Sequence, residues 1–225
     1  MYIYKKGFTL AEVLITLGII GVVATLTMPS LITNYQKKET TTRLHKVYNI
    51  LRQATVRSTI DNGDVKDWDF EQTPNDFFEK YYVPYLLYTK KGLLKDFTKV
   101  DRVDLNNNTV SINKNAAALL LPDGTFLWIN QYITIRGFWG LVVDLNGDGK
   151  PNKVGRDVFA FSFGWDDIMS YNQYPDTIFN RQTAIGGGTS GQCNKSATGG
   201  IISTGSYCSR VIELDGWEIA PDYPW

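Results

Sequence analysis

A long apolar segment near the start of the chain constrains its fold more than any other feature. Residues 8–28 read FTLAEVLITLGIIGVVATLTM, in which Glu12 is the only charged side chain. As a helix with about 1.5 Å of rise per residue, this segment spans roughly 30 Å, the thickness of the hydrocarbon core of a bilayer. The sequence therefore predicts a membrane-spanning helix, which we place at residues 8–33.

The residues on either side of this segment indicate how it is oriented. Lys5 and Lys6 precede it, and positive charge at one end predicts a cytoplasmic amino terminus with the remainder of the chain outside. A cleaved secretory signal peptide is the alternative, with an apolar core of about 7–15 residues and a small-x-small cleavage site. Here the apolar segment is longer and continues beyond Met28 without such a site, which favours a membrane anchor.

Glu12 is unusual because a carboxylate inside a spanning helix is costly and needs a partner. In the simplest interpretation it lies near the interface and reaches the lipid headgroups. A second interpretation starts from Gly7-Phe8, because a cut after Gly7 would create an α-ammonium group on Phe8. In a packed array of helices, the Glu12 carboxylate of one subunit can then pair with the ammonium group of its neighbour.

The string KKGFTLAE at residues 5–12, followed by about twenty apolar residues, resembles the class III signal of type IV prepilins and type II secretion pseudopilins. The resemblance implies that a membrane aspartyl peptidase cuts after Gly7, removes the leader of residues 1–7 and methylates Phe8. Pro29 resembles the helix-kinking proline that is typical of the first helix in this family, and the resemblance implies that Glu12 and Pro29 take part in assembly.

The resemblance also implies a function, partners and a location. The expected protein is a structural subunit (pilin, minor pilin or pseudopilin) of a type IV pilus or a type II secretion filament. Its partners would be homologous subunits, the prepilin peptidase and an inner-membrane assembly platform. The bilayer of the bacterial inner membrane would hold it before assembly into an extracytoplasmic filament. The alternative is a signal-anchored extracytoplasmic binding domain or enzyme that does not assemble.

The remainder of the chain, residues 34–225, is expected to form an extracytoplasmic head. Apolar residues at helical spacing continue the first helix as an amphipathic segment at residues 34–60. Apolar runs predict strands at residues 110–112, 117–121, 126–129, 140–144 and 158–163, with a hairpin turn at 122–124. A short aromatic helix at residues 75–87 is expected to be stopped by Pro84. After residue 165 the sequence reads as loop-rich. The predicted fold class is α+β, with a long amino-terminal helix packed on a small antiparallel sheet, as in pilins.

Composition argues against an enzyme and against a nucleic-acid binder. One histidine and two cysteines cannot build a His-rich zinc site or a four-cysteine metal site, and no nucleophile–base pair is recognisable. The net charge is zero, whereas a nucleic-acid binder usually has a basic excess. One basic cluster is interrupted by acidic residues, so we expect it to form a solvated face rather than a nucleic-acid site. The cluster comprises Lys90, Lys91, Lys95, Lys99 and Arg102, interrupted by Asp96, Asp101 and Asp104.

Cys193 and Cys208 enclose fourteen residues of the carboxy-terminal region. Outside the cytoplasm we expect them to form a disulfide, which stabilises a fold by about 3 kcal/mol in the chain-entropy model. Two unrelated buried thiols are the alternative. A disulfide-bounded region at this place is similar to the surface-exposed loop of pilins. The aromatic residues Trp217, Tyr223 and Trp225 are expected to pack the carboxy terminus onto the head.

The segment DLNGDGKPN beginning at residue 144 has oxygen-bearing residues at alternate positions and glycines for a sharp turn, as a calcium loop requires. Position twelve of the loop is Gly155 rather than the glutamate of an EF-hand, and Asp157 is the substitute. A metal-free hairpin loop with Asn-Gly and Asp-Gly turns is the alternative. The candidate ligands are Asp144, Asn146, Asp148, the carbonyl of Lys150, Asn152 and Asp157.

Overall fold

The computed structural model describes residues 7–131, 139–163, 168–170, 180–186, 192–197 and 205–225. The chain forms two compact units, Met1–Glu39 and Thr40–Trp225, and helix α1 (Leu10–Asn62) contributes to both. We call the second unit the head.

Helix α1 changes character along its 53 residues. In the first unit its apolar side chains are exposed, and among the described residues α1 is the helix that is long and apolar enough to cross a membrane. In the head, buried positions recur at steps of three and four residues, which is the pattern of an amphipathic helix lying on a core. These buried residues are Thr41, Leu44, Val47, Leu51, Ala54, Thr55 and Ser58. The predicted change from apolar to amphipathic helix is confirmed.

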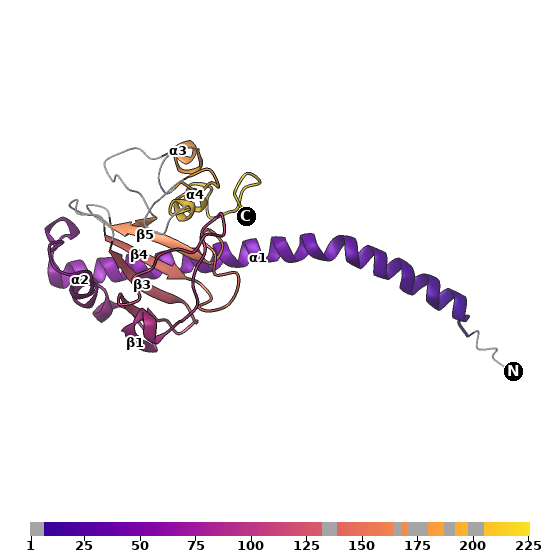
Figure 1. Ribbon diagram of the computed structural model, residues 1–225, viewed down its shortest axis with the longest axis horizontal. Coiled ribbons are helices and arrows are strands. Elements are labelled where there is room, and N and C mark those ends of the chain that lie inside the picture. Colours follow the sequence, from indigo (N-terminus) through magenta and orange to yellow (C-terminus); the bar gives the residue numbers. More distant parts are fainter. Residues whose placement is uncertain (1–6, 132–138, 164–167, 171–179, 187–191, 198–204) are drawn as a thin grey trace. The chain divides into compact units, whose positions relative to one another are not determined.

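The head is built on an antiparallel sheet of six strands that follow one another in chain order. The carboxy-terminal half of α1 runs across one face of this sheet (Figure 1). The strands are β1 (Lys90–Leu93), β2 (Ala117–Leu120), β3 (Phe126–Gln131), β4 (Trp139–Asp144), β5 (Val158–Phe163) and β6 (Ile168–Ser170). The predicted α+β, pilin-like fold class is confirmed, and the turn predicted at residues 122–124 connects β2 to β3.

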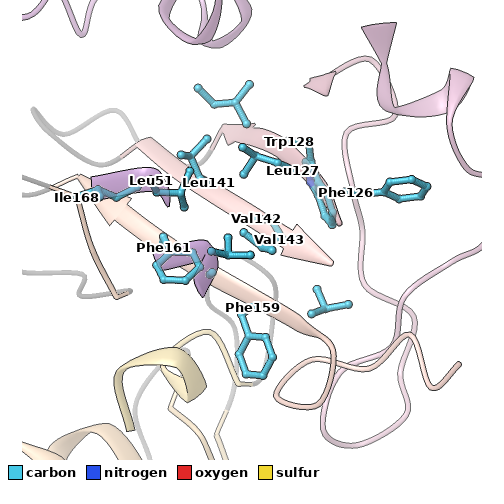
Figure 2. Packing of buried hydrophobic residues seen from close by; sticks show 14 of the residues in the cluster. Leu51, Phe126, Leu127, Trp128, Leu141, Val142, Val143, Phe159, Phe161 and Ile168 are labelled. Atoms are coloured by element: carbon cyan, nitrogen blue, oxygen red, sulfur yellow. The ribbon is translucent and has the colours of Figure 1, made fainter. Parts of the chain in front are cut away.

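Both faces of the sheet are buried. Successive side chains of a strand point to opposite sides of a sheet, and here buried side chains lie on both sides. Leu141 lies opposite Phe161, and the Phe161 ring stacks against Tyr48 of α1 with 6.1 Å between ring centroids. Figure 2 shows Leu51 of α1 beside Leu141 in the same layer. Trp128 and Val142 point to the other face and are fully buried as well. Each such side chain stabilises the fold by about 1.5–3 kcal/mol through burial.

Shorter helices complete the head. Helix α2 (Pro74–Tyr81) begins after Thr73, whose side chain accepts a hydrogen bond from the backbone of Asp76, and a 3-10 turn (Val83–Tyr85) follows it. The short helix predicted at residues 75–87 is therefore present but ends at Tyr81, and Pro84, which was expected to stop it, lies in the turn that follows. Helices α3 (Arg181–Ile185) and α4 (Cys208–Leu214) lie in the region after residue 165. They are short, five and seven residues, and lie within the region that was predicted to be loop-rich.

The strand predicted at residues 110–112 is not present. Val103 forms isolated bridges to Thr109 and Lys153, and the backbone of Val110 donates to the carbonyl of Arg102. These contacts hold residues 102–110 as a loop that turns back on itself, so the apolar Val110 and Ile112 pack against the core without joining the sheet.

Candidate functional site

The predicted processing site lies immediately before α1. Phe8 is 88% exposed, and nothing lies within 4 Å of the position that a Cβ on Gly7 would take. The peptide bond between them is thus unprotected by the fold, as a peptidase substrate requires. Lys5 and Lys6, the basic pair of the signal, lie outside the described residues.

Glu12 has a local role that the sequence analysis did not recognise. The backbone N–H and the hydroxyl of Thr9 both donate to Oε2 of Glu12, each at 2.8 Å, and the Glu12 N–H donates to Oγ1 of Thr9 at 3.2 Å. This reciprocal arrangement is a capping box, which satisfies backbone donors at the start of a helix. The signal was present in the sequence as Thr-x-x-Glu at residues 9–12. Glu12 therefore caps the helix and also remains a candidate for pairing between subunits.

Pro29 lies inside α1, which continues on both sides of it. Proline removes one backbone donor from a helix. The adjacent turns carry hydroxyl side chains that bond to backbone carbonyls, Ser30 to Thr27 and Thr33 to Pro29, each at 2.9 Å. The role of Pro29 in assembly remains a prediction.

The predicted disulfide is present, and it joins Cys193 to Cys208 at the first residue of α4. Both cysteines are fully buried, so the bond ties α4 into the core. Tyr223 donates its hydroxyl to the carbonyl of Gly155 at 2.6 Å, and Trp217 stacks on His45 of α1. The aromatic carboxy terminus packs onto the head as predicted.

The six candidate calcium ligands surround the turn between β4 and β5, but their side chains are engaged differently from the prediction. Asp144 is fully buried, and its Oδ2 accepts two hydrogen bonds from Arg102, at 2.9 Å from Nε and 2.8 Å from Nη2. Asp148 accepts a hydrogen bond from Thr98 and lies 3.5 Å from the same guanidinium group. Burial raises the pKa of the Asp144 carboxyl to about 7, while Arg102 acts in the opposite direction.

Arg102 was misplaced by the sequence analysis, which assigned it to a solvated basic face. Its side chain is 1% exposed and lies over the rings of Phe126 and Trp128, with 6.0 and 5.8 Å from its central carbon to their centroids. A buried loop rich in carboxylates needs a cation, but the spacing of the basic cluster gave no indication that Arg102 would supply it.

The other candidate ligands of the loop differ in whether their oxygen atoms already accept a hydrogen bond. Asp157 accepts hydrogen bonds from the backbone N–H groups of Asn152 and Lys153, at 2.7 and 2.6 Å. Asn146 donates to the Lys150 carbonyl, and the buried Oδ1 of Asn152 has no hydrogen-bond partner. Among the described residues, no three carboxylate, imidazole or thiolate side chains are grouped as metal ligands. Calcium binding therefore remains a prediction.

Comparison with known families matches the chain in two parts, which meet at the end of the apolar segment. Residues 30–225, the end of the apolar segment and the whole head, match the model of a family of unknown function (DUF6613). The chain belongs to this family. Residues 4–28 match the prokaryotic N-terminal methylation motif, so the chain carries a type IV pilin-like prepilin signal and is a pilin-type precursor. No curated protein and no solved structure matches the chain.

Proposed function

We propose that this DUF6613 protein is a structural subunit of a type IV pilus or a type II secretion filament, which is cleaved after Gly7 and assembled through α1. The observation that supports it is the methylation motif at residues 4–28, which coincides with an exposed cleavage site and the start of an apolar helix. The bacterial inner membrane would hold the subunit, with its amino terminus in the cytoplasm, until a filament takes it up.

Assembly needs an interaction that lipid cannot replace. Lipid already solvates the apolar residues of α1, so hydrophobicity alone gives subunits no reason to leave the bilayer. A charge pair between the Glu12 carboxylate and the Phe8 ammonium group of a neighbour provides both direction and spacing, because an unpaired charge in apolar surroundings costs several kcal/mol.

The test is the amino terminus of the protein extracted from membranes or from sheared surface filaments. Cleavage after Gly7 leaves 218 residues (225 minus 7) that begin with methylated Phe8, which mass spectrometry identifies directly. An intact Met1, or a cut beyond Met28, would contradict the proposal. A processed protein that never enters a filament would support the anchored, non-assembling alternative instead.

We also propose that the loop between β4 and β5 binds calcium through the six candidate ligands, which are Asp144, Asn146, Asp148, the Lys150 carbonyl, Asn152 and Asp157. The buried and unpartnered Oδ1 of Asn152 supports this proposal, because it lies in the same loop as two buried carboxylates. Bound calcium would raise the melting temperature of the full-length protein in detergent relative to chelator. Mass action gives about 2.7 kcal/mol at a hundredfold excess over the dissociation constant. Asn146→Ala should remove this gain, and an equal melting temperature in both conditions would refute the site.

A further inference from the structure

In the head, the two sides of α1 that flank its exposed face differ from each other. Since each residue of a helix turns by about 100°, positions 45 and 48 fall on one side of the buried stripe and positions 46, 50 and 57 fall on the other. On the first side, Trp217 packs against His45 and Tyr48. On the second side, α1 borders an open groove.

The groove has a volume of about 440 Å³ and a largely apolar lining. It lies between α1, the 3-10 turn after α2 and the hairpin that connects β2 to β3. The lining residues are Lys46, Ile50, Gln53, Arg57, Tyr85, Leu87, Leu121, Pro122 and Asp123.

Exposed apolar side chains collect at this groove. Leu87 in its lining is 78% exposed, and Val56 and Ile60, on the adjacent face of α1, are 56% and 79% exposed. Within the described part of the head, no other large apolar side chain is more than 38% exposed. Apolar groups gathered in this way on an otherwise polar surface indicate an interaction site.

The charges at the groove are mainly basic. Lys46 binds Asp123 at 2.7 Å, on the rim. Arg57 also lines the groove, and no ion pair links it to a residue that the structure describes. A partner that brings a carboxylate together with apolar side chains would therefore satisfy this surface.

The opposite side of α1 presents a surface of that kind. We call residues 214–219 the carboxy-terminal flank. Leu214 is 38% exposed, and Glu218 is exposed with no ion pair to a described residue. The nearby acidic residues outnumber the basic ones by two (four minus two). The acidic residues are Glu213, Asp215, Glu218 and Asp222, and the basic ones are Arg181 and Arg210.

We propose that, in the filament, the groove of one copy of this chain receives the carboxy-terminal flank of the next copy, with Glu218 facing Arg57. This inference rests on the proposed function. A contact between two different surfaces of identical subunits repeats without limit when its rotation does not close, so it builds an open helical assembly. The groove and the flank are such a pair, and they are complementary in both apolar character and charge.

Charge reversal in the full-length chain tests the contact. In cells that express the protein, Arg57→Glu or Glu218→Arg should each lower the recovery of mature protein in sheared filaments about tenfold, because like charges then meet across the interface. The double variant should restore recovery to within about twofold of the unmodified chain. Lys99→Glu, which reverses an exposed positive charge outside the groove and the flank, is the matched control and should have little effect. Melting temperatures in detergent would show that all variants fold.

Crosslinking tests the same contact directly. Gln53→Cys combined with Glu218→Cys should give disulfide-linked ladders in filaments, whereas Gln53→Cys with Lys99→Cys should not. Single reversals that assemble normally, a double variant without rescue, or equal crosslinking by the control pair would overturn the inference while leaving the filament function intact. Absence of the unmodified chain from every filament would refute the proposed function and this contact together.

Discussion

Single residues in the head are constrained most strongly where a charge is buried. Arg102 and Asp144 are 1% and 0% exposed, and each is the other's principal counter-charge. Removing one partner of a buried pair leaves the other charge uncompensated, which costs more than the pair itself contributes.

Arg102→Met should therefore lower the free energy of unfolding by about 3–5 kcal/mol. The control is Lys114→Met, which removes an exposed pair with Asp101 and should cost at most about 1 kcal/mol. Chemical denaturation of the full-length protein in detergent compares the two variants. If both variants lose the same small amount, the Arg102 pair contributes little to stability.

Gly155 shows a second kind of constraint, in which conformation and space act together. Its φ is +78°, a backbone conformation that residues with a side chain rarely adopt. A Cβ added to Gly155 would lie 2.9 Å from Sγ of Cys208. Gly63 has almost the same φ of +77° but nothing within 4 Å.

The two glycines therefore separate strain from steric overlap. Gly63→Ala should destabilise the head by about 1–2 kcal/mol through backbone strain alone. Gly155→Ala should cost about 1–3 kcal/mol more, because the core around the disulfide must also shift. Melting curves of both variants provide the comparison. Equal losses would mean that the core beside Cys208 accommodates a methyl group without cost.

At the scale of elements, predictability followed the strength of the local pattern. The long helix and strands β2 to β5 were predicted because their apolar residues keep a helical or strand period, or form a continuous buried run. Strand β1 reads Lys-Lys-Gly-Leu and has no apolar alternation, so only its pairing with β2 makes it a strand. Helix α4 is seven residues long and begins at a disulfide cysteine, so it depends on tertiary contacts that a sequence pattern does not contain.

The disulfide should accordingly matter most for α4. Replacing both Cys193 and Cys208 with alanine should destabilise the head by about 3 kcal/mol in the chain-entropy model, because the unfolded chain regains freedom between them. Hydrogen exchange would locate the effect, with faster exchange expected for the amides of α4 than for those of β3 and β4. A uniform change across the head would contradict this assignment.

The candidate sites were predictable to different degrees, depending on whether their residues are contiguous in the sequence. Gly7, Phe8 and Glu12 belong to one contiguous signal, so sequence alone identified them and the methylation-motif match supports the signal. The ligands proposed for calcium were also contiguous, but the partner of Asp144 was not. Arg102 is 42 residues away and reaches Asp144 because its loop lies beside the turn between β4 and β5, where Val103 bridges Lys153.

At the scale of the whole molecule, assembly is the property that separates a filament subunit from a membrane anchor. A substitution of Glu12 can distinguish a filament subunit from a membrane anchor. Because Glu12 also belongs to the capping box, however, a substitution that removes its whole polar group changes two properties at once. Glu12→Val would remove both the cap, which contributes about 0.5–2 kcal/mol to a helix, and the charge. A useful experiment must separate them.

Glu12→Gln and Thr9→Val make that separation. Glutamine can still close a capping box but carries no charge, whereas Thr9→Val removes the hydroxyl of the cap and leaves the carboxylate. If Glu12 pairs with the Phe8 ammonium group of a neighbour, Glu12→Gln should be cleaved and inserted normally, yet accumulate in the membrane rather than in sheared filaments. Thr9→Val should retain assembly. Equal recovery of Glu12→Gln and the unmodified chain in filaments would mean that the carboxylate acts only as a helix cap.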